Sequence, residues 1–114
     1  MKKPLLTFLL SVASAVPAFA YDFSGCQVIE IVIAGENNAH VQLDCAVTNA
    51  PACAVANRYL GFDKSTTGGK HYLTMLTLAH AMGGKIEGSV DHAVCSPFQG
   101  NVPLLNGLRT KLPE

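Results

Sequence analysis

Residues 65–84 read STTGGKHYLTMLTLAHAMGG. The hydroxyl residues at the start of this stretch are typical of helix N-caps, and Gly83 and Gly84 at its end are typical of a helix stop. Between Gly69 and Met82, apolar side chains recur at helical spacing. They form one stripe: Tyr72, Met75, Leu76, Ala79 and Met82. The sequence therefore predicts one helix here, and the segments around it follow a different pattern.

The segments before the helix have the composition of β-strands. Residues 23–34 are rich in β-branched Val and Ile, which predicts a long, well-buried strand. Gly and Asn at residues 35–38 favour a turn, and polar and apolar residues alternate in the return strand at 40–45. After a loop at residues 48–51, a third strand is predicted over residues 55–63.

Two more strands are predicted after the helix, over residues 85–95 and 102–108, the second interrupted by Pro103 and Gly107. Three strands, a helix and two strands is the element order of the OB-fold, a small five-stranded barrel. No repeat or linker divides the chain after its first twenty residues. We therefore expect a mainly β fold, a five-stranded OB-fold barrel with one helix between strands three and four, in a single domain covering residues 21–114.

The first twenty residues have the three parts of a secretory signal peptide. Lys2 and Lys3 form a basic head, residues 5–16 are apolar, and the sequence AFA ending at Ala20 is a small-x-small exit. A transmembrane anchor is the alternative, but it needs about 20 apolar residues and this run is shorter. We expect cleavage after Ala20, a secreted or periplasmic protein, and no membrane span once the leader is removed.

Four cysteines remain after that cleavage, and an even count in an oxidising compartment predicts two disulfides. A hairpin that turns near Gly35 places Cys26 opposite Cys45, although another turn centre would move the match. In a barrel of this kind Cys53 and Cys95 would flank the helical connection, which favours their pairing. All three connectivities remain open at this stage, and a zinc site is the alternative. The lack of a C-x-x-C pair and the predicted export disfavour zinc.

The charge of the chain argues against polyanionic partners. Of eight basic residues, Lys2 and Lys3 leave with the predicted leader, so six remain against eight acidic residues. Binding to phosphates or to an anionic membrane draws on clustered Lys and Arg, and the remaining cations are scattered. We expect no nucleic-acid partner.

The residues that carry enzyme or metal chemistry show no suitable arrangement. The four histidines are His40, His71, His80 and His92. Nine residues apart on a helix, His71 and His80 fall on opposite faces, so metal binding is not expected. A hydrolase needs a nucleophile with an oriented base, and no such pair is recognisable. The sequence therefore predicts a protein that is not an enzyme and has no cofactor.

Several short motifs spread over residues 22–95 point to a family. Phe23-Ser24-Gly25 precedes the β-branched strand, FDKSTTGGK covers residues 62–70, Leu-Thr-x-Ala lies in the helix at 76–79, and a strand that starts with Gly-Lys ends at Cys95. A cysteine also precedes the third strand. In these features the chain resembles the cell-binding B subunits of AB5-type toxins, specifically the subtilase cytotoxin B subunit type, which are small secreted OB-fold proteins.

The resemblance implies a function and a site. B subunits of this type bind glycans, commonly sialylated ones, on the side of the barrel. The serine of the Phe-Ser-Gly segment is their principal hydroxyl contact to the sugar. It corresponds to Ser24, and Asp22 adds a carboxylate beside it. The subtilase-type pocket also has an aromatic residue from the fourth strand, where this chain has Ser89 and Val90, so that stacking platform is missing.

The partners that the resemblance implies are a glycan or glycoprotein receptor and four further copies in a homopentamer, with a separate A subunit. The alternative is a free-standing periplasmic OB-fold protein that binds a small ligand or an envelope partner.

Overall fold

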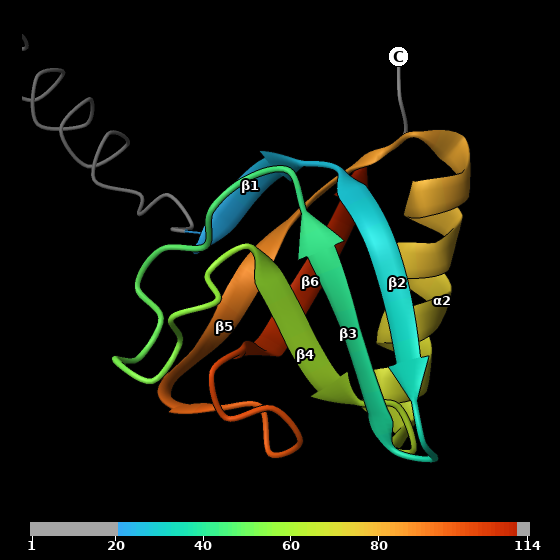
Figure 1. Cartoon of the computed structure of the whole chain (residues 1–114). Coiled ribbons are helices and arrows are strands. Elements are labelled where there is room, and N and C mark those ends of the chain that lie inside the picture. Colours follow the sequence, from blue (N-terminus) through green and yellow to red (C-terminus); the bar gives the residue numbers. More distant parts are fainter. Residues whose placement is uncertain (1–20, 112–114) are drawn as a thin grey trace, which may run out of the picture.

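The computed structural model describes residues 21–111, and the predicted signal peptide at residues 1–20 lies outside them. The described chain is mainly β with one helix (Figure 1). Its elements in order are β1 (Phe23–Cys26), β2 (Val28–Ala34), β3 (Asn38–Leu43), β4 (Tyr59–Asp63), α2 (Thr67–Met82), β5 (Lys85–Cys95) and β6 (Pro103–Lys111).

The six strands form one sheet in the order β1-β5-β6-β4-β3-β2. Neighbouring strands are antiparallel except β4 and β6, which are parallel. The predicted closed barrel of five strands is not confirmed, because the sheet has six strands and is open, with the first predicted strand divided into β1 and β2. Gly25 has a positive φ of 65°, Cys26 still pairs with Ile86 of β5, and after Gln27 the chain pairs with β3 instead.

The burial of β2 differs from the prediction for residues 23–34. Val28 is buried, but Ile29 and Ile33 are 52% and 51% exposed. Because β2 is an edge strand, the expectation of a well-buried strand is wrong over this part. A run of β-branched residues indicates a strand, and it does not by itself say whether both faces are covered.

The ends of two further strands also differ. The third predicted strand begins at Tyr59 and not at residue 55. The segment before it is a loop with its own turns, in which Ala54 N–H donates to Pro51 O and Tyr59 N–H to Ala56 O. The last strand is longer than predicted and continues to Lys111, where it pairs with Lys85 at the start of β5.

The helix has the caps that the sequence predicts. Thr66 is the N-cap and accepts a hydrogen bond from Gly69 N–H at 2.9 Å, while Gly83 closes the helix in the left-handed conformation with φ 66°. The predicted stripe is only partly buried: Leu76 and Ala79 face the core, but Met82 is 48% exposed. Figure 1 shows α2 alongside β2, away from the long loop between β3 and β4.

Both disulfides join the cysteines that the sequence favoured. Cys26 is bonded to Cys45, with Cα atoms 5.5 Å apart, and Cys53 is bonded to Cys95, with Cα atoms 6.4 Å apart. An irregularity between Val28 and Glu30 shifts the register of β2 and β3 by one residue, so that Val28 pairs with Leu43. Continued past Val28, this register places Cys26 opposite Cys45. Two disulfides fit a secreted or periplasmic protein. Among residues 21–111, no helix is both long and apolar enough to cross a bilayer.

Candidate functional site

The outward faces of β3 and β4 carry an adjacent histidine and tyrosine. In β3, Ala39, Val41 and Leu43 are fully buried, so the alternate residues, among them His40, lie on the opposite face. The register pairs His40 with Gly61 and Gln42 with Tyr59. His40 and Tyr59 are therefore diagonal neighbours on one face, and their ring centroids lie 6.1 Å apart with the planes tilted by 56°.

The loop between β5 and β6, residues 96–102, closes one side of this face. A Cβ added at Gly61 would lie 2.9 Å from Ser96 Cβ and 3.2 Å from Val102 Cγ1, so the loop approaches β4 where β4 has no side chain. The loop is held by a hydrogen bond from Ser96 N–H to Val102 O at 2.8 Å. It is also joined to the segment before β4 by a bond from Ala56 N–H to Asn101 O at 3.0 Å.

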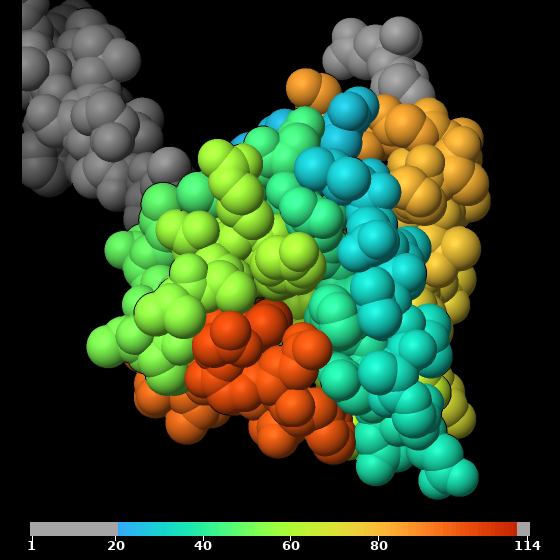
Figure 2. Space-filling view, viewed as in Figure 1, coloured from blue at the N-terminus to red at the C-terminus, as the bar shows by residue number. Residues whose placement is uncertain are grey.

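A cleft of about 250 Å³ lies between these elements. Its lining residues come from β3, from β4 with the segment before it, and from the loop: His40, Ala56, Tyr59, Gln99, Asn101 and Val102. Figure 2 shows this face, with the orange-red residues of the loop lying against the green residues of the two strands. We call this feature the His40–Gln99 cleft.

Two polar atoms of the cleft lack a hydrogen-bond partner. His40 Nδ1 and Gln99 Oε1 are buried and unpaired in the described part of the chain. A third such atom, Asn38 Oδ1, belongs to the residue two positions before His40 on the same strand. Leaving a buried polar group unpaired costs about 1–3 kcal/mol, and most buried polar groups have a partner. A cleft with two such atoms is therefore suited to a ligand that supplies the missing hydrogen bonds.

The predicted ligand-binding residue Asp22 is buried and makes several internal contacts. Its Oδ2 accepts hydrogen bonds from Val90 N–H and contacts His92 Nε2, both at 2.9 Å, and its Oδ1 accepts from Asn49 Nδ2 at 3.3 Å. Burial alone would raise the pKa of Asp22. The hydrogen bonds from Val90, His92 and Asn49 outweigh it and hold the pKa below its ordinary value. Asp22 thus connects the start of β1 to β5 and to the loop after β3.

Ser24, the other predicted ligand-binding residue, is exposed on β1. β1 pairs only with β5 and is not next to β3 or β4 in the sheet. Ser24 does not line the His40–Gln99 cleft. The structure thus places Asp22 inside the protein, Ser24 on its surface, and the cleft elsewhere.

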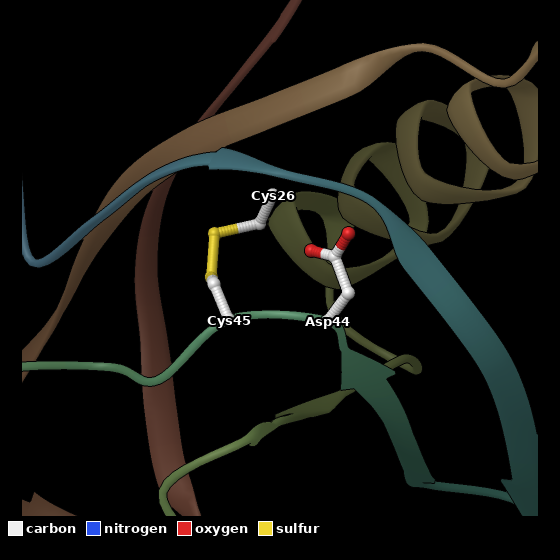
Figure 3. A group of neighbouring side chains, drawn as sticks. All are labelled: Cys26, Asp44 and Cys45. Carbon is white, nitrogen blue, oxygen red and sulfur yellow. A yellow bond between two sulfur atoms is a disulfide. The ribbon is translucent and has the colours of Figure 1, made fainter.

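One group of potential metal ligands is accounted for by a disulfide. Cys26, Asp44 and Cys45 have ligand atoms within 4.8 Å of one another. Figure 3 shows the three side chains and the bond between the two sulfur atoms. The two sulfur atoms are bonded to each other and offer no thiolate to a metal ion. The Asp44 carboxylate accepts a hydrogen bond from Gln27 N–H at 2.8 Å. These three residues join the end of β1 to the segment after β3.

The cleft is not predicted by the sequence. His40 is a candidate there only as a metal ligand, Tyr59 is only part of a predicted strand, and Gln99 and Asn101 have no predicted role. The available signal was polar residues at outward strand positions, which is also the ordinary pattern of a solvated sheet face. The chain matches no protein-family model, no curated protein and no solved structure.

Proposed function

We propose that the protein is a secreted, non-catalytic module that binds carbohydrate in the His40–Gln99 cleft. The observation that carries the proposal is the pair of buried, unpaired polar atoms on His40 and Gln99 beside the ring of Tyr59. Sugars present hydroxyl groups that both donate and accept hydrogen bonds, next to apolar C–H faces that pack on aromatic rings. A cleft with an aromatic wall and a few convergent polar groups has the composition of a small-molecule site.

The cleft also contains an aromatic residue that the β5 strand lacks. Ser89 and Val90 stand where the subtilase-type pocket has its aromatic residue, and Tyr59 of β4 supplies a ring at a different place. The proposal therefore keeps glycan binding as the function and moves the site away from Ser24.

The composition of the cleft favours binding over catalysis. Its polar side chains are those of His40, Tyr59, Gln99 and Asn101. Nucleophilic catalysis needs a hydroxyl or thiol activated by an oriented base, and His40 Nδ1 has no partner of that kind within the described residues. Amide and imidazole groups suit hydrogen bonding to a ligand.

The strand order supports an OB-fold, which is the fold of the toxin B subunits that the chain resembles. β1 and β2 are separated by Gln27 alone, yet they pair with β5 and β3 at the two edges of the sheet. Two consecutive strands, β1 and β2, thus lie at opposite edges of the sheet, and β4 and β6 form a parallel pair between them, an order that we relate to a partly open barrel of this type. In this proposal the ligand belongs to a glycan or glycoprotein receptor, and a separate A subunit is the partner.

Assembly into a homopentamer is the second part of the toxin-type proposal. The outer face of α2 has an apolar groove of about 420 Å³, lined by Leu73, Thr74, Thr77, Leu78 and Ala81. Leu78 is 55% exposed, and the small residues around it allow a close approach of another helix. Light scattering of the purified protein at micromolar concentration tests this part, and a monomeric mass would exclude the pentamer.

Binding of the purified protein to a glycan array tests the proposed function. We expect Tyr59→Ala and Gln99→Ala to abolish or strongly weaken binding, because each removes a wall or a hydrogen-bonding group of the cleft. Asn57→Ala is the matched control, since Asn57 is an exposed amide close by that does not line the cleft. Loss of binding in Ser24→Ala with normal binding in the cleft variants would place the site on β1 instead.

The alternative is a free-standing periplasmic protein that binds a small ligand in the same cleft. A neighbouring gene for an exported toxin-type enzyme would favour the B subunit, and an isolated gene would favour the alternative.

A further inference from the structure

We infer that the His40–Gln99 cleft accepts one uncharged sugar residue, such as a neutral hexose at the end of a glycan. This inference rests on the proposed function and specifies its ligand. It excludes acidic sugars and cationic amines as the group that enters the cleft.

The first reason is the charge of the lining. Among the described residues that line the cleft, none is Lys, Arg, Asp or Glu, and the titratable ones are His40 and Tyr59. A charged group that leaves water needs an opposite charge or several hydrogen bonds to offset its lost hydration. Neither a carboxylate nor an ammonium group finds a fixed counter-charge here. A neutral hydroxyl loses much less hydration on entry.

The cations and anions in the neighbouring sequence are engaged away from the lining. Arg58 precedes Tyr59, but its guanidinium donates to Asp44 O at 3.0 Å. Lys64, just after β4, donates to Glu36 O at 2.6 Å. Asp63 at the end of β4 accepts hydrogen bonds from Ser65. These residues belong to the turns at the strand ends and are not among those that line the cleft.

The second reason is the type of the unpaired atoms. Gln99 Oε1 is an acceptor, so a ligand hydroxyl can donate to it, whereas an ionised carboxylate group cannot. His40 Nδ1 donates or accepts according to its tautomer. A hydroxyl group both donates and accepts, so it satisfies either tautomer.

The third reason is size. The volume of about 250 Å³ lies below the range of about 300–1,000 Å³ that is usual for pockets of drug-sized ligands. One monosaccharide with Tyr59 beside it is the appropriate occupant, and the rest of a glycan would extend into solvent.

The test is a glycan array probed with the protein purified from the exported fraction. The array is used before and after treatment with neuraminidase, which removes sialic acid. We expect binding to glycans that end in a neutral hexose, unchanged or increased by the treatment. We expect competition by the free neutral sugar at millimolar concentration and none by free sialic acid or by a simple alkylamine.

Gln99→Glu provides a second readout that does not depend on loss of folding. The variant keeps the shape of the side chain and adds a negative charge to the cleft. For a neutral ligand we expect affinity to fall by roughly tenfold, because the new carboxylate must be partly desolvated when the ligand binds. For a cationic ligand affinity would rise instead, which would overturn the inference.

The outcomes separate the inference from the proposed function. Binding that disappears after neuraminidase, or that free sialic acid inhibits, overturns the neutral-sugar inference, while sensitivity to Tyr59→Ala still supports glycan binding in the cleft. If no glycan on the array is bound, the proposed function fails, and the inference fails with it.

Discussion

At the scale of single residues, Gly61 is where the loop at 96–102 packs against β4. Glycine at this position lets the loop at 96–102 lie directly on β4, because Ser96 and Val102 occupy the space that a side chain would need. A side chain here would push the loop outward. Gly61 is also the register partner of His40, so this contact lies beside the cleft.

We predict that Gly61→Ala lowers the free energy of unfolding by about 1–3 kcal/mol, as for other insertions into close-packed sites. Thermal or urea unfolding measures this. Gly68→Ala is the control, because nothing lies within 4 Å of a Cβ at Gly68 and its φ is not positive. In the first turn of α2 alanine should be neutral or stabilising. Equal destabilisation by both changes would show that the contact with Ser96 is unimportant.

Asp22 controls stability through its charge. Its pKa is lowered in the folded protein from an ordinary value of 3.8. A carboxyl group with a lowered folded-state pKa contributes stability that is complete above the ordinary value and is lost as pH falls through the folded value. Part of the acid sensitivity of this protein therefore originates at the contacts of Asp22 with Val90 and His92.

We predict that Asp22→Asn is less stable than the wild type at pH 7 by about 1–3 kcal/mol, because an amide cannot accept all the hydrogen bonds that the carboxylate accepts. The difference should shrink as the pH falls below about 4. Urea unfolding over this pH range measures it. The pKa values of Asp63 and Asp91 are also lowered. Both residues are present in the wild type and in the variant, so their effects on stability cancel in the difference. Ser24→Ala, on the exposed side of β1, should change stability by less than about 0.5 kcal/mol.

At the scale of elements, the helix was predictable and the cleft was not, for a physical reason. Thr66 and Gly83 act on residues within one turn of themselves, so the caps of α2 can be read from neighbouring residues. The break at Gln27 follows from pairing with β5, which lies far along the chain. The contact of His40 with Tyr59 depends on the strand register, and Gln99 comes from a separate loop. Local patterns do not contain these distant relations.

The two disulfides should have different effects on binding. Cys53–Cys95 joins the segment before β4 to the start of the loop at 96–102, and both contribute residues to the cleft. Cys26–Cys45 joins the end of β1 to the segment after β3. The two bonds therefore connect different parts of the sheet, and only one of them connects the walls of the cleft.

We predict that replacing both cysteines of the 53–95 pair by alanine lowers stability by roughly 4 kcal/mol and weakens glycan binding. Replacing the 26–45 pair should cost roughly 3 kcal/mol, because its loop is shorter, with little effect on binding where the protein remains folded. Unfolding and array binding at a temperature below both transitions check this. Stronger loss of binding in the 26–45 variant would contradict the assignment.

At the scale of the whole molecule, the predicted cleavage site lies directly before the first described residue. The described chain begins at Tyr21, whose hydroxyl accepts a hydrogen bond from Arg109 on β6 at 2.8 Å. The predicted cleavage site after Ala20 would therefore leave a first residue that is already held by the sheet.

We predict that the protein recovered from the exported fraction has lost residues 1–20 and contains both disulfides. Intact mass under non-reducing and reducing conditions measures both properties. Ala20→Leu should slow the processing, since the exit site requires a small residue there. The mass of the full chain in the exported wild type would contradict the prediction.

The bent pair of strands β1 and β2 has a consequence for the order in which the chain folds. β1 lies at the start of the described chain, but its partner β5 is Lys85–Cys95, near the other end. A chain that crosses a membrane with its N-terminal end first therefore emerges with a first strand that has no partner until almost the whole chain has followed. Contacts between residues so distant in sequence form slowly. For an exported chain we expect the sheet to be completed only after translocation ends. β1 would then be the first strand to emerge and among the last to form its hydrogen bonds.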